Sequence, residues 1–142
     1  MHQTSIVIVQ EDIATGKFLF RELKKFGYKV ELFFDGKLAL DHAKEEIPDI
    51  ILLDLRLPGM NGFIVCQSLK NEPITSKIKI IIFSAYSGTE KIKRAFEAGA
   101  DLYIVKPVRF TTIKQILEEA ANSPEFPNNF KKKYIKFMLP NN

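Results

Sequence analysis

Five short apolar stretches alternate along the chain with five stretches of helical periodicity, and this alternation constrains the fold more than any other feature. The apolar stretches are rich in β-branched residues and include unbroken runs, as is typical of strands buried on both faces. We expect strands at residues 5–9, 28–34, 50–53, 79–83 and 102–105. We expect helices at about 14–26, from Gly36 to just before Pro48, through Val65 and Leu69, and at about 89–98 and 110–121. Such alternation predicts a parallel sheet with right-handed crossovers and helices on both faces.

Length and composition fit one globular domain that can bury a core. The chain has 142 residues, of which 46% are hydrophobic and 27% charged, which argues against disorder. The longest apolar runs, 50–53 and 80–83, are too short to cross a bilayer, so no membrane association is expected. Residues 1–5 lack the pattern of a signal peptide, and Cys66 has no second cysteine to pair with. These features predict a cytoplasmic protein in which Cys66 is a core thiol.

The net charge of +4 is uneven along the chain. Residues 1–122 carry 17 Lys and Arg against 16 Asp and Glu, whereas residues 123–142 carry four Lys against Glu125. We therefore predict a domain over residues 1–122 and a basic, aromatic C-terminal tail or linker over 123–142. The tail is interpreted as a solvated extension that packs an aromatic stripe on the domain, with a partner-binding helix or a contact with anionic surfaces as the alternative. It is too short for a DNA-binding domain, so no direct DNA binding is expected.

Chemically active side chains stand at the ends of four of the five predicted strands. Glu11 and Asp12 follow the first strand, Asp54 the third, Ser84 the fourth and Lys106 the fifth. Parallel strands in such sheets end along one rim, where ligands bind beside a topological switch point. We expect the first and third strands to be neighbours, which would crowd three carboxylates together.

Crowded carboxylates repel one another unless a cation intervenes, and oxygen-rich sites suit Mg²⁺. Phosphoryl transfer to an aspartate needs two carboxylates that hold a divalent ion, a third carboxylate that is free to attack, a lysine and a hydroxyl. Each residue also has an ordinary explanation: Asp12 as a helix N-cap, Asp54 as a turn residue, Ser84 as a turn hydroxyl and Lys106 as a solvated charge. Their joint occurrence on one rim favours the functional interpretation.

The same residues resemble a known family. The matching segments are residues 6–12 (IVIVQED), 48–62 (PDIILLDLRLPGMNG), 82–85 (IFSA) and 99–107 (GADLYIVKP). In this order and spacing they resemble the receiver domains of two-component response regulators, over residues 5–121. The fold class implied is α/β: a doubly wound, five-stranded parallel sheet in the flavodoxin-like order 2-1-3-4-5 with five flanking helices.

The resemblance implies a phosphoacceptor and a metal site. Asp54 would accept the phosphoryl group. Glu11, Asp12 and Asp54, with the backbone carbonyl of Arg56, would position Mg²⁺. The donor would be a sensor histidine kinase or a histidine phosphotransfer protein, and the output protein is unknown.

The resemblance also implies a switch. Ser84 would donate to the phosphoryl oxygens, and Lys106 would contact the same group. Ser84 would move toward the phosphate and Tyr103 would turn inward, which remodels the face made by the fourth helix, the fifth strand and the fifth helix. The Lys106–Pro107 peptide bond is expected to be cis. The segment 110–121 lacks the basic dimer-contact signature of transcription-factor receivers, which argues against that mode of dimerisation.

Three other functions fit the sequence less well. An aspartate-nucleophile phosphohydrolase of the haloacid-dehalogenase type would need a second acid where Arg56 stands, and no cap domain is evident. A flavodoxin-like FMN protein would need a Ser/Thr/Gly-rich phosphate loop after the first strand. A degenerate receiver would lack Asp54, the acidic pair or Lys106, all of which are present. We therefore expect a signalling domain and no enzyme beyond self-catalysed phosphorylation and dephosphorylation.

Overall fold

The chain folds into a five-stranded parallel sheet in the order β2-β1-β3-β4-β5. The computed structural model describes residues 2–128 and 130–139. The strands are β1 (Ser5–Val9), β2 (Lys29–Phe33), β3 (Ile50–Leu53), β4 (Lys79–Ser84) and β5 (Leu102–Val105). The helices are α1 (Ile13–Lys25), α2 (Gly36–Glu46), α3 (Gly62–Lys70), α4 (Thr89–Glu97), α5 (Phe110–Asn122) and the short 3-10 helix η1 (Ile135–Phe137). The predicted fold class and strand order are confirmed.

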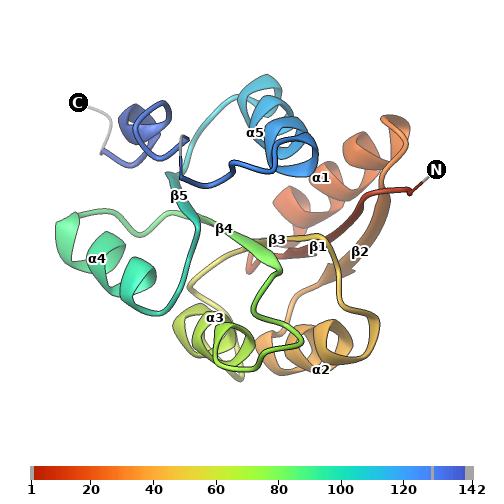
Figure 1. Cartoon of the computed structure of the whole chain (residues 1–142), viewed down its shortest axis with the longest axis horizontal. Helices are drawn as coiled ribbons and strands as arrows, with labels where there is room; N and C mark the ends of the chain where they lie inside the picture. The colour runs from red at the N-terminus through yellow and green to blue at the C-terminus, as the bar shows by residue number, and fades with distance from the viewer. Residues whose placement is uncertain (1, 129, 140–142) are drawn as a thin grey trace.

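The helices cover the sheet in two layers (Figure 1). Helices α1 and α5 lie on one face, and α2 and α3 lie on the other, with α4 next to α3. Every residue of β3 is buried, and β1 is buried from Ile6 onward, because helices cover both sides of these central strands. None of the helices in the described part of the chain has both the length and the hydrophobicity needed to cross a bilayer.

Polar residues in the loops that follow the strands start three of the helices. The side chains of Asp12, Asp35 and Asn61 each accept a hydrogen bond from a backbone N–H in the first turn of α1, α2 and α3. Such N-caps satisfy amides that have no partner within the helix. The strand register brings Val9 opposite Leu53 and Leu53 opposite Ile82, so the loops after β1, β3 and β4 meet at one rim.

The C-terminal segment packs against the domain. Phe126, Tyr134 and Met138 are buried and belong to the same hydrophobic core as the sheet. Figure 1 shows this segment beside β5, near α5. The packing of an aromatic stripe on the domain agrees with the preferred interpretation of the sequence, whereas the predicted boundary between residues 122 and 123 stays a prediction.

Candidate functional site

Asp54 lies directly after β3, at the centre of the rim, and its side chain is almost fully buried, with the residue 4% exposed. Its backbone N–H continues the sheet by donating to the carbonyl of Val9 at 2.8 Å. One carboxylate oxygen, Oδ2, accepts from the backbone N–H of Glu11 at 3.4 Å, and Oδ1 accepts from that of Arg56 at 3.3 Å. The loops after β1 and β3 therefore hold both oxygens of Asp54 in place.

Lys106 supplies a positive charge next to this carboxylate. Its Nζ donates to Oδ2 of Asp54 at 3.2 Å, and only 18% of the lysine side chain is exposed. The ammonium group also lies 5.1 Å from the centre of the Phe83 ring. The Lys106–Pro107 peptide bond is cis, as the resemblance implies. A partly buried ion pair of this kind limits the positions open to both groups.

Ser84 closes β4 and is fully buried. Its Oγ accepts a hydrogen bond from the backbone N–H of Tyr86 at 3.3 Å, and its carbonyl accepts from the N–H of Lys106 at 2.8 Å. The hydroxyl is thus placed at the same rim as Asp54 and linked to the loop between β4 and α4.

The acidic pair after β1 faces other partners. Oε2 of Glu11 lies 3.4 Å from Nε of Arg56. Oδ2 of Asp12 accepts from the hydroxyl and the backbone N–H of Thr15, and these bonds hold the pKa of Asp12 below its ordinary value. Asp12 thus serves as the N-cap that the sequence offered as its ordinary explanation. Glu11 and Asp12 therefore each pair with a local partner, and in the described part of the chain the three carboxylates are not gathered into a ready metal cluster.

The pair nevertheless shares a hollow with the acceptor. A cavity of about 560 Å³ at the rim is lined by Glu11, Asp12, Asp54, Arg56 and Lys106, among others. Within residues 2–128 and 130–139, no three Asp, Glu, His or Cys side chains are gathered as a ready metal site. The donors around the hollow are oxygens, which is the ligand type that Mg²⁺ prefers. The donor chemistry therefore fits Mg²⁺, and the metal-ligand assignment stays a prediction.

Tyr103 is buried on β5 and points to the loop after β4. Its hydroxyl donates to the backbone carbonyl of Tyr86 at 2.8 Å, and the side chain is fully buried. Burial, together with the nearby Asp54 carboxylate and Tyr86 phenol, raises the pKa of Tyr103 well above its usual range. Tyr103 and Ser84 thus contact opposite ends of the same residue, Tyr86, one at its carbonyl and the other at its amide.

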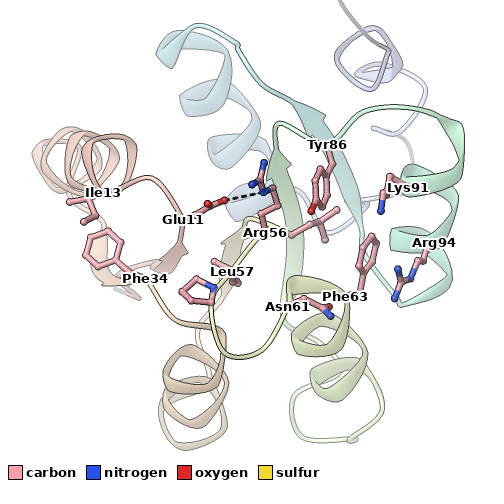
Figure 2. A pocket seen from close by; sticks show the side chains of 12 residues that line it. Glu11, Ile13, Phe34, Arg56, Leu57, Asn61, Phe63, Tyr86, Lys91 and Arg94 are labelled. Atoms are coloured by element: carbon pink, nitrogen blue, oxygen red, sulfur yellow. Dashed lines mark ion pairs between the residues drawn. The ribbon is translucent and has the colours of Figure 1, made fainter.

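A second hollow, of about 640 Å³, adjoins the acceptor and carries mainly positive charge (Figure 2). The guanidinium of Arg56 lies 5.7 Å from the centre of the Tyr86 ring, and Nζ of Lys91 lies 4.8 Å from the same ring. Arg94 lies 4.1 Å from the centre of the Phe63 ring. Such cation–aromatic contacts hold the basic groups beside the site.

A family model described as the response regulator receiver domain matches residues 6–118 of the chain. The chain belongs to this family. It is therefore a receiver domain of the kind used in two-component signalling, as the motifs and their spacing predicted.

Named relatives agree with this assignment. The chain is 37% identical to the response regulator PleD of Caulobacter vibrioides over 103 residues, which is 72% of this chain and 23% of PleD. It is 31% identical to the probable transcriptional regulator ycf27 of Porphyridium aerugineum over 136 residues, which is 91% of this chain and 55% of that protein. The structure is similar to the BeF3-activated DrrB receiver domain, with a TM-score of 0.76, 26% identity, and coverage of 84% of this chain and 98% of that one. The receiver domain spans less than two thirds of these curated relatives.

The receiver domain brings most of the predicted site residues together. Asp54, Lys106, Glu11 and Asp12 line one hollow, and the backbone of Arg56 contacts the acceptor carboxylate. Ser84 and Tyr103 are joined through Tyr86. Their roles as acceptor, metal ligands and switch stay predictions.

Sequence reasoning missed the charged neighbours on α4 and one buried amide. Lys91 and Arg94 stand one helical turn apart on α4, and this i, i+3 spacing was the signal that could have placed them on one face. Gln10 is fully buried at the end of β1. Its Nε2 donates to the carbonyl of Phe83 at 3.5 Å, whereas its Oε1 has no partner among the described residues. No pattern in the sequence separated Gln10 from the strand before it.

Proposed function

We propose that this receiver domain accepts a phosphoryl group on Asp54 from a sensor histidine kinase or a histidine phosphotransfer protein, and thereby switches a partner-binding face. The single observation that carries this proposal is the setting of the Asp54 carboxylate. It is nearly buried, its two oxygens are held by two backbone amides, and Nζ of Lys106 lies 3.2 Å away at the edge of an open hollow.

The reaction that fits this setting is an in-line displacement. An oxygen of Asp54 forms a bond to phosphorus while the bond between phosphorus and the histidine nitrogen of the donor breaks, and that nitrogen keeps the electron pair. The product is an acyl phosphate on Asp54. The backbone amides of Glu11 and Arg56 orient the attacking carboxylate before the donor arrives, so little rearrangement is needed at that residue.

Lys106 and Ser84 are suited to the charge that arrives with the phosphoryl group. The ammonium of Lys106 would contact a phosphoryl oxygen instead of the carboxylate it now pairs with. The hydroxyl of Ser84 can donate a hydrogen bond to a second oxygen, which changes its present contact with Tyr86. Prearranged donors of this kind stabilise developing charge without further ordering.

Mg²⁺, when bound, would neutralise charge on the phosphoryl oxygens. Glu11, Asp12, Asp54 and the carbonyl of Arg56 are the groups we assign to it. The side chains of Glu11 and Asp12 would exchange Arg56 and Thr15 for the ion. Because the phosphoryl donor we propose is a histidine kinase or a phosphotransfer protein, we assign the receiver domain to the cytoplasm. We assign it no chemistry beyond the uptake and loss of the phosphoryl group.

The test is phosphoryl uptake by the full chain. Incubation with Mg²⁺ and acetyl phosphate should add one phosphoryl group by intact mass, and beryllofluoride should change the NMR spectrum. Asp54→Asn should abolish both. The matched control is Asp41→Asn, the same chemical change at an exposed residue of α2, which pairs with Lys37. Uptake that survives in Asp54→Asn, or that is lost equally in the control, would contradict the assignment.

A further inference from the structure

The fifth strand lies at one edge of the sheet and yet exposes almost none of its side chains. Leu102 and Tyr103 are 0% exposed, Ile104 is 1% exposed and Val105 is 7% exposed. At the opposite edge, on β2, Lys29 and Glu31 are exposed. Edge strands are commonly shielded by a helix or a loop that covers them. Here the cover includes the C-terminal segment, because η1 packs against β5.

A stripe of four side chains holds this segment on the domain. Phe126, Phe130, Tyr134 and Met138 follow one another at intervals of four residues, and three of the four are buried. Ring centres of Phe126 and Phe130 lie 5.6 Å apart, and those of Phe130 and Tyr134 lie 6.4 Å apart. Aromatic pairs at these distances add to the stabilisation from burial.

Polar contacts fasten the same segment to both neighbouring helices. On α5, Glu119 accepts hydrogen bonds from Nζ of Lys133, at 2.6 Å, and from the hydroxyl of Tyr134. On the α4 side, Nζ of Lys131 lies 4.7 Å from the centre of the Phe96 ring. The segment therefore spans the surface formed by α4, β5 and α5, and it contacts all three elements.

The covered strand leads directly to the acceptor. Tyr103, in the middle of β5, donates to the carbonyl of Tyr86, whose amide in turn donates to Ser84. Lys106, which pairs with Asp54, follows the last residue of β5. An arrangement in which Tyr103 left its buried position would lose the bond to Tyr86 and alter the surface on which the segment rests.

From these contacts we propose that residues 124–128 and 130–139 are an intramolecular ligand of the surface formed by α4, β5 and α5, and that docking of this segment and occupation of Asp54 stabilise each other. The second half rests on the proposed function. Coupling of this kind is reciprocal by thermodynamic linkage. Its path would run through Tyr86, whose amide donates to Ser84 at the rim and whose carbonyl accepts from Tyr103 on the covered strand. A partner that binds this surface must therefore displace the C-terminal segment.

Trypsin cleavage within residues 131–136 of the full chain, followed by intact mass, measures docking. Met138→Ala removes a buried contact and should speed cleavage by about 30-fold. Tyr134→Phe keeps the ring and removes only the bond to Glu119, and it should speed cleavage by about 10-fold. Ile135→Ala is the matched control, since Ile135 is 55% exposed on the same segment, and it should cleave at the wild-type rate. Equal rates in all four proteins would overturn the docking.

Mg²⁺ with beryllofluoride then tests the coupling. Saturation should slow cleavage of the wild-type segment by about 5-fold or more, within the usual range of coupling between sites. By reciprocity, Met138→Ala should weaken beryllofluoride binding, measured by NMR, by up to the same factor, which is reached when the segment is fully undocked. Beryllofluoride that binds without changing cleavage overturns the coupling alone. Failure to bind at all removes the proposed function and the coupling together, whereas the docking is still judged by the cleavage of the variants without ligand.

Discussion

Replacing Gly62 with alanine is the smallest change that tests how tightly the acceptor loop is held. Gly62 is the first residue of α3, and its amide donates to the carbonyl of Leu55 at 3.0 Å. A Cβ at this position would lie 2.3 Å from the carbonyl oxygen of Asp54 and 2.7 Å from the Cα of Leu55. Both atoms belong to the backbone that carries the acceptor, so no side-chain rotation can relieve the overlap.

The size of the effect follows from these distances. Ordinary van der Waals contacts begin at 3.4 Å, so α3 or the acceptor loop must move apart. Overpacking of this kind costs about 1–3 kcal/mol, which leaves a typical domain folded. A displacement of about 1 Å in a reacting group can slow group transfer by about 100-fold. We therefore expect Gly62→Ala to be folded, moderately less stable and severely slowed in phosphoryl uptake.

The assay measures the rate of uptake from acetyl phosphate by intact mass, together with urea unfolding of the same samples. Gly27→Ala is the control. Gly27 is distant in sequence from Gly62 and lies in a turn with φ +88, where an added Cβ would have no atom within 4 Å. It should lose about 1–2 kcal/mol from backbone strain and keep the wild-type rate of uptake. Wild-type uptake by Gly62→Ala, or equal slowing in Gly27→Ala, would refute the idea that this close contact places Asp54.

Three other measurements probe the rest of the molecule. Lys70→Met should lower the free energy of unfolding by about 3 kcal/mol in urea titrations, because it leaves the poorly exposed carboxylate of Asp101 without its cation; a loss near zero would contradict this. Burial raises the pKa of the Cys66 thiol to about 12, so Cys66 should resist thiol reagents at pH 8 in the folded protein and react once unfolded. Burial alone would raise the pKa of Glu119, but hydrogen bonds from the C-terminal segment hold it below its ordinary 4.5. The stabilisation that these bonds give to the docked segment is therefore complete above pH 4.5 and lost as the pH falls through the lowered pKa. Burial and the bond to Glu119 raise the pKa of Tyr134, so the contribution of the Tyr134 hydroxyl to docking is fully present below pH 10 and lost as the pH rises through the raised pKa. Ring shifts of Tyr134 followed by NMR should show both transitions, and titration at the ordinary values would contradict the contact.

The framework of the fold could be predicted because it rests on local patterns. The unbroken apolar run 50–53 identified the central strand, and Gly27 and Pro48 marked where helices end. The rim of functional residues followed from the same reasoning, since parallel strands that alternate with helices all end on one side. Asp54 and Lys106, which are 52 residues apart in the sequence, are in contact for this reason.

The parts that escaped prediction depend on competition between side chains across loops. Glu11 pairs with Arg56, and Asp12 pairs with Thr15, contacts that the strand-and-helix pattern does not predict. A strand-and-helix pattern places residues at a rim but does not decide which polar neighbour each one selects. The burial of Phe126 was equally hidden, because the prolines around it interrupt any regular periodicity and indicate only a linker.

The cover over β5 also bears on how this protein behaves at high concentration. A sheet has two margins at which a foreign strand can add, and here one carries the charged residues Lys29 and Glu31 while the other lies under the chain's own C-terminal residues. Proteolytic cleavage near Lys131 would therefore expose the apolar edge of the sheet at β5. The cleaved protein should self-associate and precipitate under conditions in which the intact protein stays dispersed.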